Sequence, residues 1–574
     1  MDNNQVADFF TRIANLLQIR DEPSYRVLAY RRASESILGL STPIEDLWES
    51  NELESIPGVG KAIAEKISEI LDTGKLEFYD RLIDEIPESL LDLLEVPDLG
   101  PKRISKFWKE LGITNLEELE AAAKENQLQE LTGIGERTEK RILRNLELMK
   151  SREVSRVSIG DAFPIAEGLV SAIRKIPKVK DVQFAGSLRR MRETIGDLDL
   201  VASTDHAVDV IQAFLNFPEI EDVTGQGEIK VSVRLKGGLK AQLWVHSPEH
   251  YGAALQYATG SQSHNVRLRE IAQKNGLSLS EYGFKSEDGD EIPCPQEVDV
   301  YQTLDLPWIP PELREDRGEI AAAKKNALPD LICEADLRGE IHAHSNWSDG
   351  HATIEEMAEA AIALGLSYLV ITDHSRSLGI ANGLSIERLK EQRVAIDKLQ
   401  SKLGDDLLLL QGSEVEVKTD GSLDYPDDVL AELDFVVASV HTSLRQSQEK
   451  ITQRFLAAIE NPHIDLIGHL SGRLIGRREP ADLDVESIFA TAAKNKVALE
   501  INAHPDRLDL NEFHAKRAVE LGCMLAITTD AHHPDHFHLR KYGVGVARRA
   551  WISPESVMNS WDSSQFLNWI RSRS

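Results

Sequence analysis

The sequence predicts a multidomain α+β protein with helical hairpins first, a mixed α+β region in the middle and a βα-barrel last. Three observations support this fold class. A hairpin pattern occurs three times before residue 150, short strands and helices begin near residue 155, and strand-like and helical runs alternate regularly after residue 333. At 574 residues the chain is long enough for several domains of ~100–200 residues each.

Composition and charge limit the class of protein. Hydrophobic residues make up 41% and charged residues 28%, as in soluble globular proteins, and no apolar run reaches the ~18 residues that cross a bilayer. The start, MDNNQVADFF, lacks the basic-then-apolar layout of an export signal. Cys294, Cys333 and Cys523 lie far apart, which favours a reducing cytoplasm. Because the formal net charge is −30, nucleic-acid binding must depend on local basic features.

The repeated hairpin pattern comprises IPGVGKAIAEKI (56–67), VPDLGPKRISKF (96–107) and LTGIGERTEKRI (131–142). Each copy has an apolar residue, a tight glycine turn and then an amphipathic run. Glycine lets a backbone approach a ligand closely, and the N–H groups that open the second helix can hold a phosphate. Asp98 replaces the first turn glycine of the second copy, and its charge would repel a phosphate. The expected DNA contacts are Gly58, Gly60, Gly100, Gly133 and Gly135.

This pattern resembles the helix-hairpin-helix motif, which grips the DNA backbone without reading sequence. Plain helical hairpins are the alternative, but three copies in under 100 residues favour DNA binding. Local positive charge accompanies the third copy. Its basic residues are Arg137, Lys140, Arg141, Arg144, Lys150 and Arg152.

The segment VQFAGSLRRMRETIGDLDLVAST (182–204) predicts a nucleotidyl-transfer site. Asp197 and Asp199 are two residues apart on a predicted strand, so both carboxylates lie on one face. Such a pair can bind Mg²⁺ through oxygen, while the Gly186–Ser187 turn and the following arginines hold a triphosphate. A structural role for the two aspartates is the alternative, but a Gly-Ser turn ahead of G-D-x-D is fairly specific.

The chain here resembles the family X DNA polymerases, over roughly residues 1–320. YRVLAYRRASESI (25–37) is similar to the family's DNA-end-binding domain, and YATGSQSHNVRLR (257–269) is similar to its nucleotide-pocket segment. The resemblance implies that Asp197 and Asp199 are catalytic and bind Mg²⁺ or Mn²⁺ in a nucleotidyltransferase-type palm. The implied nucleotide-binding residues are Gly186, Ser187, Arg190, Tyr257, Gly260, Ser261, Asn265 and Arg269.

Three positions depart from the family's pattern. Its third catalytic aspartate and a nearby arginine, in a strand written D-L-R, are replaced by Gln242 and Trp244, and Ala258 replaces a phenylalanine. The third carboxylate helps to bind the catalytic metal and can accept the proton of the 3′-hydroxyl, whereas an amide carries no charge. Each ~1.4 kcal/mol of lost stabilisation is tenfold in rate, so we expect strand extension to be crippled or absent. Glu228 is a nearby acid that could replace the missing one.

Lys66 in AIAEKISEI matches the family's Schiff-base lysine, which removes abasic sugar-phosphate. The resemblance therefore makes Lys66 a further catalytic candidate. The alternative is an ordinary solvated lysine. A lysine acts as a nucleophile only where its surroundings depress its pKa, and most lysines on helices are simply solvated.

Histidines and acids recur at the ends of the predicted strands beyond residue 333. In a βα-barrel the ends of the strands gather the active site, so we expect these side chains to meet. Buried structural histidines are the alternative, but so many sites in about 190 residues make that reading unsatisfactory. Mixed imidazole and carboxylate ligands suit Zn, Mn or Fe better than Mg alone. The candidate metal ligands are His342, His344, Asp349, His374, Glu414, His441, His469, Asp530 and His532.

This region resembles the PHP (polymerase and histidinol phosphatase) domain, a distorted (β/α)7 barrel. The resemblance fills all of that domain's metal-ligand positions and implies a trinuclear cluster of Mn²⁺ or Zn²⁺, with Glu414 as bridging and catalytic carboxylate. In bacterial family X polymerases such a domain is a metal-dependent 3′–5′ exonuclease. Arg473 is expected either to contact substrate phosphate or to form a salt bridge.

These expectations give a domain order and a function. The expected parts are an N-terminal DNA-end-binding domain (1–85), a helix-hairpin-helix domain (86–152), a palm (153–250), a thumb-like nucleotide-pocket subdomain (251–318), a linker (319–332) and a PHP domain (333–574). We expect a cytoplasmic, monomeric DNA-repair exonuclease acting on gapped or 3′-ended duplex DNA, with a dNTP as a further ligand and no membrane. The alternatives are a working gap-filling polymerase, a small-molecule phosphatase and a non-catalytic DNA-binding scaffold.

Overall fold

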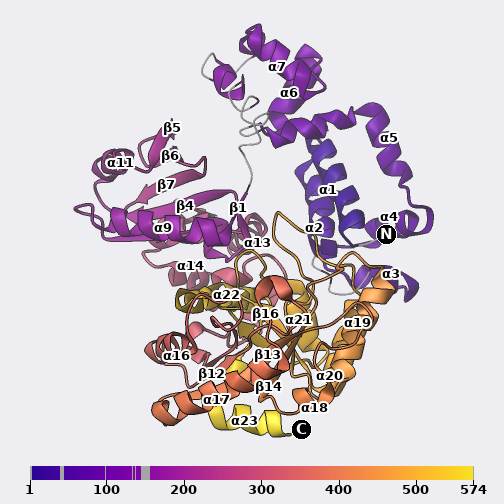
Figure 1. The fold of residues 1–574 in the computed structure, drawn as a ribbon. Coiled ribbons are helices and arrows are strands. Elements are labelled where there is room, and N and C mark those ends of the chain that lie inside the picture. Colours follow the sequence, from indigo (N-terminus) through magenta and orange to yellow (C-terminus); the bar gives the residue numbers. More distant parts are fainter. Residues whose placement is uncertain are drawn as a thin grey trace. The chain divides into compact units, whose positions relative to one another are not determined.

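The computed structural model describes residues 3–38, 40, 44–96, 99–131, 134–135, 138–143, 146 and 156–572. The chain divides into two compact units, residues 1–155 and 156–574 (Figure 1). Among the described residues no helix combines the length and the apolar character needed to cross a bilayer. The three cysteines are free thiols.

The described part of the first unit consists of helices. Helix α1 (Asn3–Arg20) packs along α2 (Ser24–Leu38), because apolar residues such as Phe10 and Ile37 recur on the facing sides and are fully buried. The other helices are α3 (Ile44–Glu49), η1 (Leu53–Ser55), α4 (Lys61–Thr73), α5 (Glu77–Glu85), η2 (Glu88–Glu95), α6 (Pro101–Leu111), α7 (Leu116–Lys124) and η3 (Leu128–Glu130).

The three sequence repeats share two backbone hydrogen bonds among their described residues. In the first copy the N–H of Val59 donates to the carbonyl of Ile56 (3.0 Å), and the N–H of Ile63 donates to the carbonyl of Gly60 (2.9 Å). The same two bonds recur as Leu99 to Val96 and Arg103 to Gly100, and as Ile134 to Leu131 and Thr138 to Gly135. A 3-10 helix, η1, η2 or η3, precedes each turn, so the first arm of each hairpin is a 3-10 helix and the second is an α-helix.

The turn glycines play two different structural parts. Gly58 has a φ of +84°, and a Cβ there would lie 3.2 Å from the Cβ of Arg32 on α2, so this position requires glycine. Gly60 and Gly100 are the N-caps of α4 and α6, without a side-chain cap, and a Cβ on either would meet no atom within 4 Å. Outside the described residues lie Gly133, Asp98, Arg137, Arg144, Lys150 and Arg152.

The second unit opens with a five-stranded sheet in the order β2-β4-β7-β6-β5. Strands β4 and β7 are parallel, whereas the other neighbours are antiparallel. Helices α9 (Ile159–Arg174) and α11 (Ala207–Leu215) pack against this sheet. The strands are β2 (Asp181–Phe184), β4 (Asp197–Ser203), β5 (Ile220–Gln226), β6 (Lys230–Leu235) and β7 (Lys240–His246), with the short pair β1 (Val157–Ser158) and β3 (Thr194–Ile195) and helix α10 (Gly186–Arg189) beside them.

A smaller subdomain follows the sheet. Its core includes the buried side chains of Leu268, Phe284 and Tyr301, and the same core takes in Ile320 and Leu331. Residues 319–332 are therefore packed and contain a helix. The elements are α12 (Tyr251–Thr259), α13 (Gln262–Lys274), β8 (Leu277–Ser280), β9 (Gly283–Ser286), β10 (Glu291–Ile292), α14 (Glu297–Thr303), η4 (Pro311–Leu313) and α15 (Glu319–Lys324).

The rest of the second unit is a seven-stranded parallel barrel whose strands follow one another in chain order. A bridge between Ala343 and Ala531 joins the first strand to the end of the last and nearly closes the barrel, which confirms the predicted (β/α)7 architecture. Its strands are β11 (Gly339–Ala343), β12 (Tyr368–Ile371), β13 (Leu408–Glu416), β14 (Phe435–Ser439), β15 (Leu466–Ile467), β16 (Ala498–Asn502) and β17 (Leu525–Thr528).

Helices surround the barrel strands (Figure 1). The longer helices bury one apolar face, as Met357 and Ala361 of α16 do. The helices of this part are η5 (Glu334–Asp336), α16 (Ile354–Ala363), η6 (Gly379–Ala381), α17 (Ile386–Leu403), α18 (Asp427–Leu430), α19 (Gln448–Glu460), α20 (Val485–Asn495), α21 (Glu512–Glu520), η7 (Pro534–Leu539), α22 (Arg540–Arg549), η8 (Pro554–Ser556), η9 (Met558–Ser560) and α23 (Ser563–Arg571).

The five-stranded sheet and the barrel pack directly against each other within the second unit. The rings of Phe163 on α9 and Tyr542 on α22 meet edge to face at 5.9 Å. A Cβ on Gly160 would lie 2.6 Å from Pro505, so glycine permits this close approach. Buried apolar residues of both parts form one continuous core. The sheet and the barrel therefore belong to one packed unit.

Candidate active sites

The predicted metal ligands of the barrel come together at the carboxyl ends of its strands. His342 lies on β11, Glu414 lies on β13, and the other predicted ligands follow the ends of β11, β12, β14, β15 and β17. Strand β16 contributes none of the predicted ligands. Parallel strands that close into a barrel bring residues distant in sequence to one end, which explains the convergence.

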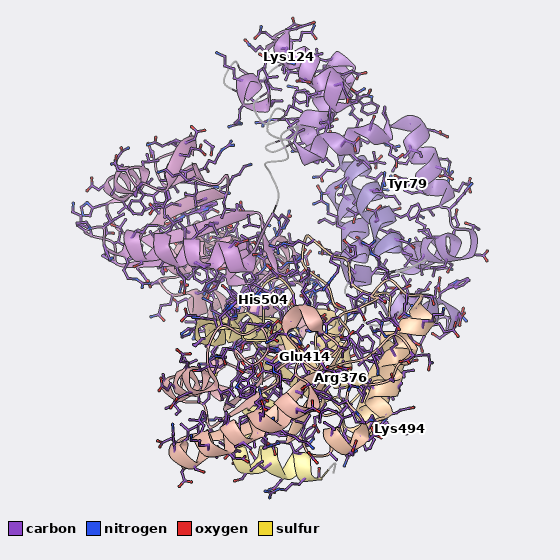
Figure 2. All side chains as sticks on the ribbon, viewed as in Figure 1. Tyr79, Lys124, Arg376, Glu414, Lys494 and His504 are labelled. Carbon is purple, nitrogen blue, oxygen red and sulfur yellow. The ribbon has the colours of Figure 1, made fainter. Side chains whose placement is uncertain are left out.

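Glu414 contacts several of the predicted ligands and lies at the centre of this cluster. Figure 2 labels Glu414 within the barrel. Its Oε2 atom is 2.9 Å from Nδ1 of His374, and its Oε1 atom is 3.0 Å from Nε2 of His469. His441 is also within 3.3 Å, and His342 and His344 are 3.5 and 3.6 Å away. One carboxylate in contact with imidazoles on several sides is the arrangement expected of a bridging ligand.

The remaining acids complete the cluster. Asp530 lies 3.1 Å from Nε2 of His344, and Asp349 lies 3.5 Å from His374 and 3.4 Å from His532. Three groups have ligand atoms within 4.8 Å of one another and could each hold a metal ion. The groups are His344, Asp349, His374 and His532; His342, His344 and Asp530; and His374, Glu414 and His441.

Buried polar atoms without hydrogen bonds show that the cluster fits divalent ions. Nε2 of His342, both ring nitrogens of His344, Oε2 of Glu414 and Nδ1 of His469 are buried with no hydrogen-bond partner. Buried polar atoms are normally satisfied, so such a concentration calls for a ligand. Imidazole nitrogens and carboxylate oxygens suit Mn²⁺, Zn²⁺ or Fe²⁺. We therefore conclude that the donor set fits a divalent-metal cluster.

The electrostatics of the cluster favour the metal-binding forms of two key ligands. Burial, together with the charges of His532 and His374, lowers the pKa of His344 to about 3, so its imidazole is neutral. Burial would raise the pKa of Glu414, but the neighbouring histidines outweigh it and hold that pKa well below its usual value. Glu414 is therefore ionised.

The sequence prediction missed acids that orient the ligands. Glu500 on β16 accepts a hydrogen bond from Nδ1 of His342 (2.5 Å), and Glu416 on β13 accepts one from Nδ1 of His441 (2.7 Å). Carboxylates behind ligating histidines fix the ring orientation and make the imidazole a better donor. The available signals were Glu500 inside the apolar run VALEI and Glu416 two residues after Glu414 in SEVEV.

Arg473 forms contacts within the protein. Its guanidinium donates to the carbonyls of Arg507 (2.7 Å) and Leu508 (2.6 Å) and forms an ion pair with Glu193 of the sheet domain (2.8 Å). Of the two expectations for Arg473, the salt bridge is thus the one observed. The pair joins the segment before β3 to the loop after β15. The two bonds to carbonyls link Arg473 to the loop after β16, whose Arg507 lies 3.9 Å from Asp530.

The second candidate site lies on the five-stranded sheet. Asp199 on β4 is directly opposite Gln242 on the parallel strand β7. Nε2 of Gln242 donates a hydrogen bond to Oδ2 of Asp197 (3.0 Å). Because a carboxylate only accepts, the amide presents its N–H group in the corner where a third acid would offer oxygen. In this arrangement the amide offers the corner a hydrogen-bond donor in place of a metal-binding oxygen.

Asp199 lies in a tightly packed place. Burial and the charge of Asp197 raise its pKa to about 7. Gly186, with a φ of +60°, allows the chain to pass the carboxylate, because a Cβ there would lie 2.3 Å from Oδ2 of Asp199. The required glycine and the aspartate thus belong to one local arrangement.

A pocket of about 690 Å³ opens above the two aspartates. It contains every predicted nucleotide-binding residue except Ser261, whose hydroxyl caps helix α13 instead. Arg189 pairs with Glu297, and Glu228 is exposed in the turn after β5; neither lines the pocket. The lining residues are Arg156, Gly186, Ser187, Arg190, Arg192, Asp197, Asp199, Tyr257, Ala258, Gly260, Gln262, Asn265, Arg269 and Glu315.

Lys66 lies on α4 of the first unit and is partly exposed. Its ammonium donates to the carbonyl of Ala62 (3.4 Å) and lies 5.2 Å from the centroid of the Phe78 ring. The ring and the carbonyl are both typical partners of a charged lysine. The lyase role of Lys66 stays a prediction.

Comparison with known families divides the chain in the same order as the structure. The helix-hairpin-helix domain matches residues 1–76, and the SAM-like helix-hairpin-helix tandem matches residues 90–147. The DNA polymerase beta thumb matches residues 254–315. The PHP domain matches residues 340–504, which include every predicted barrel ligand except Asp530 and His532.

Known proteins resemble the chain over different lengths. DNA polymerase/3′-5′ exonuclease PolX of Bacillus subtilis (strain 168) is 38% identical over 563 residues, 98% of each chain. DNA polymerase lambda of Rattus norvegicus is 26% identical over 320 residues, 51% of this chain and 52% of the relative. A probable phosphatase of Thermoanaerobacter sp. (strain X514) is 29% identical over 234 residues, 38% of this chain and 89% of the relative. With a PolX relative matched end to end and these domains in this order, the chain belongs to the family X DNA polymerases that carry a C-terminal PHP domain.

Proposed function

We propose that this protein is a divalent-metal-dependent 3′–5′ exonuclease acting on DNA ends, with its catalytic centre in the PHP barrel. The observation that carries the proposal is the convergence of buried histidines and acids around Glu414, with ring nitrogens and a carboxylate oxygen left without hydrogen bonds. The exonuclease named in the B. subtilis relative supports this choice of activity.

The residues of the barrel divide into those that bind ions and those that orient the binders. The predicted ligands would hold a cluster of Mn²⁺ or Zn²⁺, with Glu414 between its members. Bound ions would polarise the phosphodiester and lower the pKa of a coordinated water. Glu500 and Glu416 fix the rings of His342 and His441, which keeps one nitrogen of each ring directed into the cluster.

The helical repeats of the first unit are proposed to hold the DNA backbone. Gly60 and Gly100 leave the starts of α4 and α6 open, and no side chain caps either helix. Helix N-termini attract phosphate through their N–H groups and dipole. Lys61 and Lys102, both exposed next to these glycines, add positive charge despite the acidic total. This contact would be independent of base sequence.

The palm is proposed to position nucleic acid or nucleotide without extending a strand. Gln242 donates an N–H to Asp197 where the reaction needs an acid. Glu228 is exposed and does not line the pocket, so it does not replace the missing acid. Two other functions remain in competition. A working polymerase is favoured by the intact pocket, and a phosphatase by the Thermoanaerobacter relative.

A gapped duplex tests all three functions in one experiment when the strand that carries the 3′ end at the gap is labelled. Incubation with Mn²⁺, with and without dNTPs, should shorten the labelled strand and give no extension product. His342→Ala should abolish shortening, whereas Gln242→Asp should leave it unchanged. Histidinol phosphate, offered as a competing substrate, should be hydrolysed far more slowly than the oligonucleotide. Shortening that persists in His342→Ala would place the nuclease elsewhere.

A further inference from the structure

Asp349 is the ligand of the barrel cluster that the strands position least. Strand β11 ends at Ala343, and Asp349 lies farther beyond the end of its strand than any other predicted ligand. It belongs to a turn in which the N–H groups of Ser348 and Gly350 both donate to the carbonyl of Ser345 (3.1 and 3.0 Å). The place of the Asp349 carboxylate therefore depends on the contacts that hold this turn.

The fully buried carboxylate of Asp373, which follows β12, holds the turn. Its Oδ1 atom accepts hydrogen bonds from the backbone N–H of Ser345 (2.8 Å) and from the hydroxyl of Ser348 (2.5 Å). Its Oδ2 atom accepts from the hydroxyl of Ser345 (2.6 Å) and from Nε2 of Gln392 on α17 (2.6 Å). One carboxylate thus fixes the start of the turn and the residue directly before Asp349.

A backbone carbonyl fixes the direction of the hydrogen bonds behind Asp373. Nε2 of Gln411 on β13 donates to the carbonyl of Leu389 (2.8 Å), which can only accept, and to Oε1 of Gln392 (3.0 Å). Gln392 therefore presents its oxygen to Gln411 and its NH₂ group to Oδ2 of Asp373. The backbone N–H of Ser345, on Oδ1, can only donate. Because each oxygen of Asp373 meets a group that can only donate there, an asparagine amide does not satisfy this position.

From these contacts we propose that Asp373 is a positioning residue for one ion of the barrel cluster, the ion that Asp349 and its three histidine neighbours could hold. The other two candidate groups contain no residue of the turn, so their ions do not depend on it in the same way. Asp373 itself is no ligand, because protein donors occupy both of its oxygens. The inference rests on the metal cluster of the proposed function and assigns one of its ions a separate support.

Mn²⁺ titration of the full metal-free chain tests this inference in Asp373→Asn. Native mass spectrometry counts the bound ions, and competition with a fluorescent chelator gives their affinities, below the melting temperature of each metal-free variant. Asp465→Asn is the matched control. Asp465 is also buried, and it accepts from the backbone N–H of Val436 (2.9 Å) where β14 and β15 begin, at the opposite end of these strands from the cluster. Asp349→Asn removes the ligand itself.

Asp373→Asn should weaken Mn²⁺ binding by about tenfold or more at one ion position and leave the other positions within about twofold of wild type. Asp465→Asn should bind Mn²⁺ as wild type does. Combined with Asp349→Asn, Asp373→Asn should cost less than about twofold more, because the ligand that it positions is already removed. Ser348→Ala, a milder variant that keeps Asp373, should weaken the same ion position by about threefold or more.

The inference is overturned if Asp373→Asn binds every ion as wild type does, if it weakens all ion positions equally, or if its effect is as large in Asp349→Asn as in wild type. An equal loss in Asp465→Asn, or wild-type binding by Ser348→Ala, would also overturn it. Wild-type protein that shows the expected pattern of binding but does not shorten a labelled duplex at saturating Mn²⁺ would instead refute the proposed exonuclease function and leave the inference standing.

Discussion

Glu500 gives the sharpest test of how the barrel centre is held. This carboxylate is fully buried on β16. Its Oε1 atom accepts hydrogen bonds from His342 and Thr528, and its Oε2 atom accepts from the backbone N–H of His469 and from Asn502. In Glu500→Gln one of the two carboxylate oxygens becomes an NH₂ group. Whichever oxygen is replaced, the new NH₂ group meets two hydrogen-bond donors and cannot accept from them.

The expected loss follows from this arrangement. Removing the partner of a ligating histidine costs ~10–100-fold in metal affinity, or about 1.4–2.7 kcal/mol. Glu500 supports His342 through its ring and His469 through its backbone, so we expect the upper part of that range. Exonuclease activity should fall at low Mn²⁺ and recover as Mn²⁺ is raised, because the ligands themselves are unchanged.

Mn²⁺ affinity is measured by competition with a fluorescent chelator, and bound metal by mass spectrometry. Asp434→Asn is the matched control. Asp434 directly precedes β14 and accepts hydrogen bonds from Arg393 and from the backbone N–H of Gln411 on β13. It lies at the opposite end of β14 from the cluster, so removing its charge should not change Mn²⁺ affinity. If Glu500→Gln melts like wild type and binds Mn²⁺ within about twofold of it, the reasoning is refuted.

Three further outcomes are expected. Gln242→Asp should give detectable primer extension on a gapped duplex where wild type gives none, though weakly because Trp244 remains; equal extension by both proteins would contradict the role assigned to the amide. Arg549→Met removes the buried partner that Glu315 and Glu512 share, and should lower the free energy of unfolding by ~3–5 kcal/mol, measured by urea denaturation; a loss under 1 kcal/mol would argue against this role of Arg549. Burial raises the pKa of Glu512, but the charge of Arg549 outweighs it and holds that pKa at about 2 against the usual 4.5, so the stabilisation is present above pH 4.5 and lost as the pH falls toward 2; in Arg549→Met this acid-induced loss should be smaller, and an unchanged pH profile would count against it.

Much of the barrel centre could be predicted from the sequence, because each ligand lies on or just after an apolar run that reads as a strand. When such strands alternate with helices, they form a parallel barrel whose strand ends meet at one end, whatever the length of the loops. His374 and His441 were identified in this way. The residues behind them were not, because Glu416 and Glu500 lie within strands whose alternation shows that they are buried but not which histidine they meet.

In the palm, too, the sequence identifies the residues but not the contacts between them. The sequence predicts that an acid is missing at Gln242, since the resemblance places a carboxylate of the family at this position. It does not reveal that this amide donates to Asp197 or that Lys230 rests on Trp244, because both contacts depend on the register of β7 against β4 and β6. A shift of one residue would turn these side chains to the other face.

The sequence alone therefore determined the order of the domains' motifs, the turn glycines of the hairpins and the set of candidate metal-binding side chains, because each can be read from short local patterns in the chain. Only the tertiary structure decided that Arg473 joins the sheet to the barrel through Glu193, and that acids of β13 and β16 orient the ligands. Such contacts join segments far apart in sequence, and their partners are chosen by strand register and packing rather than by local pattern.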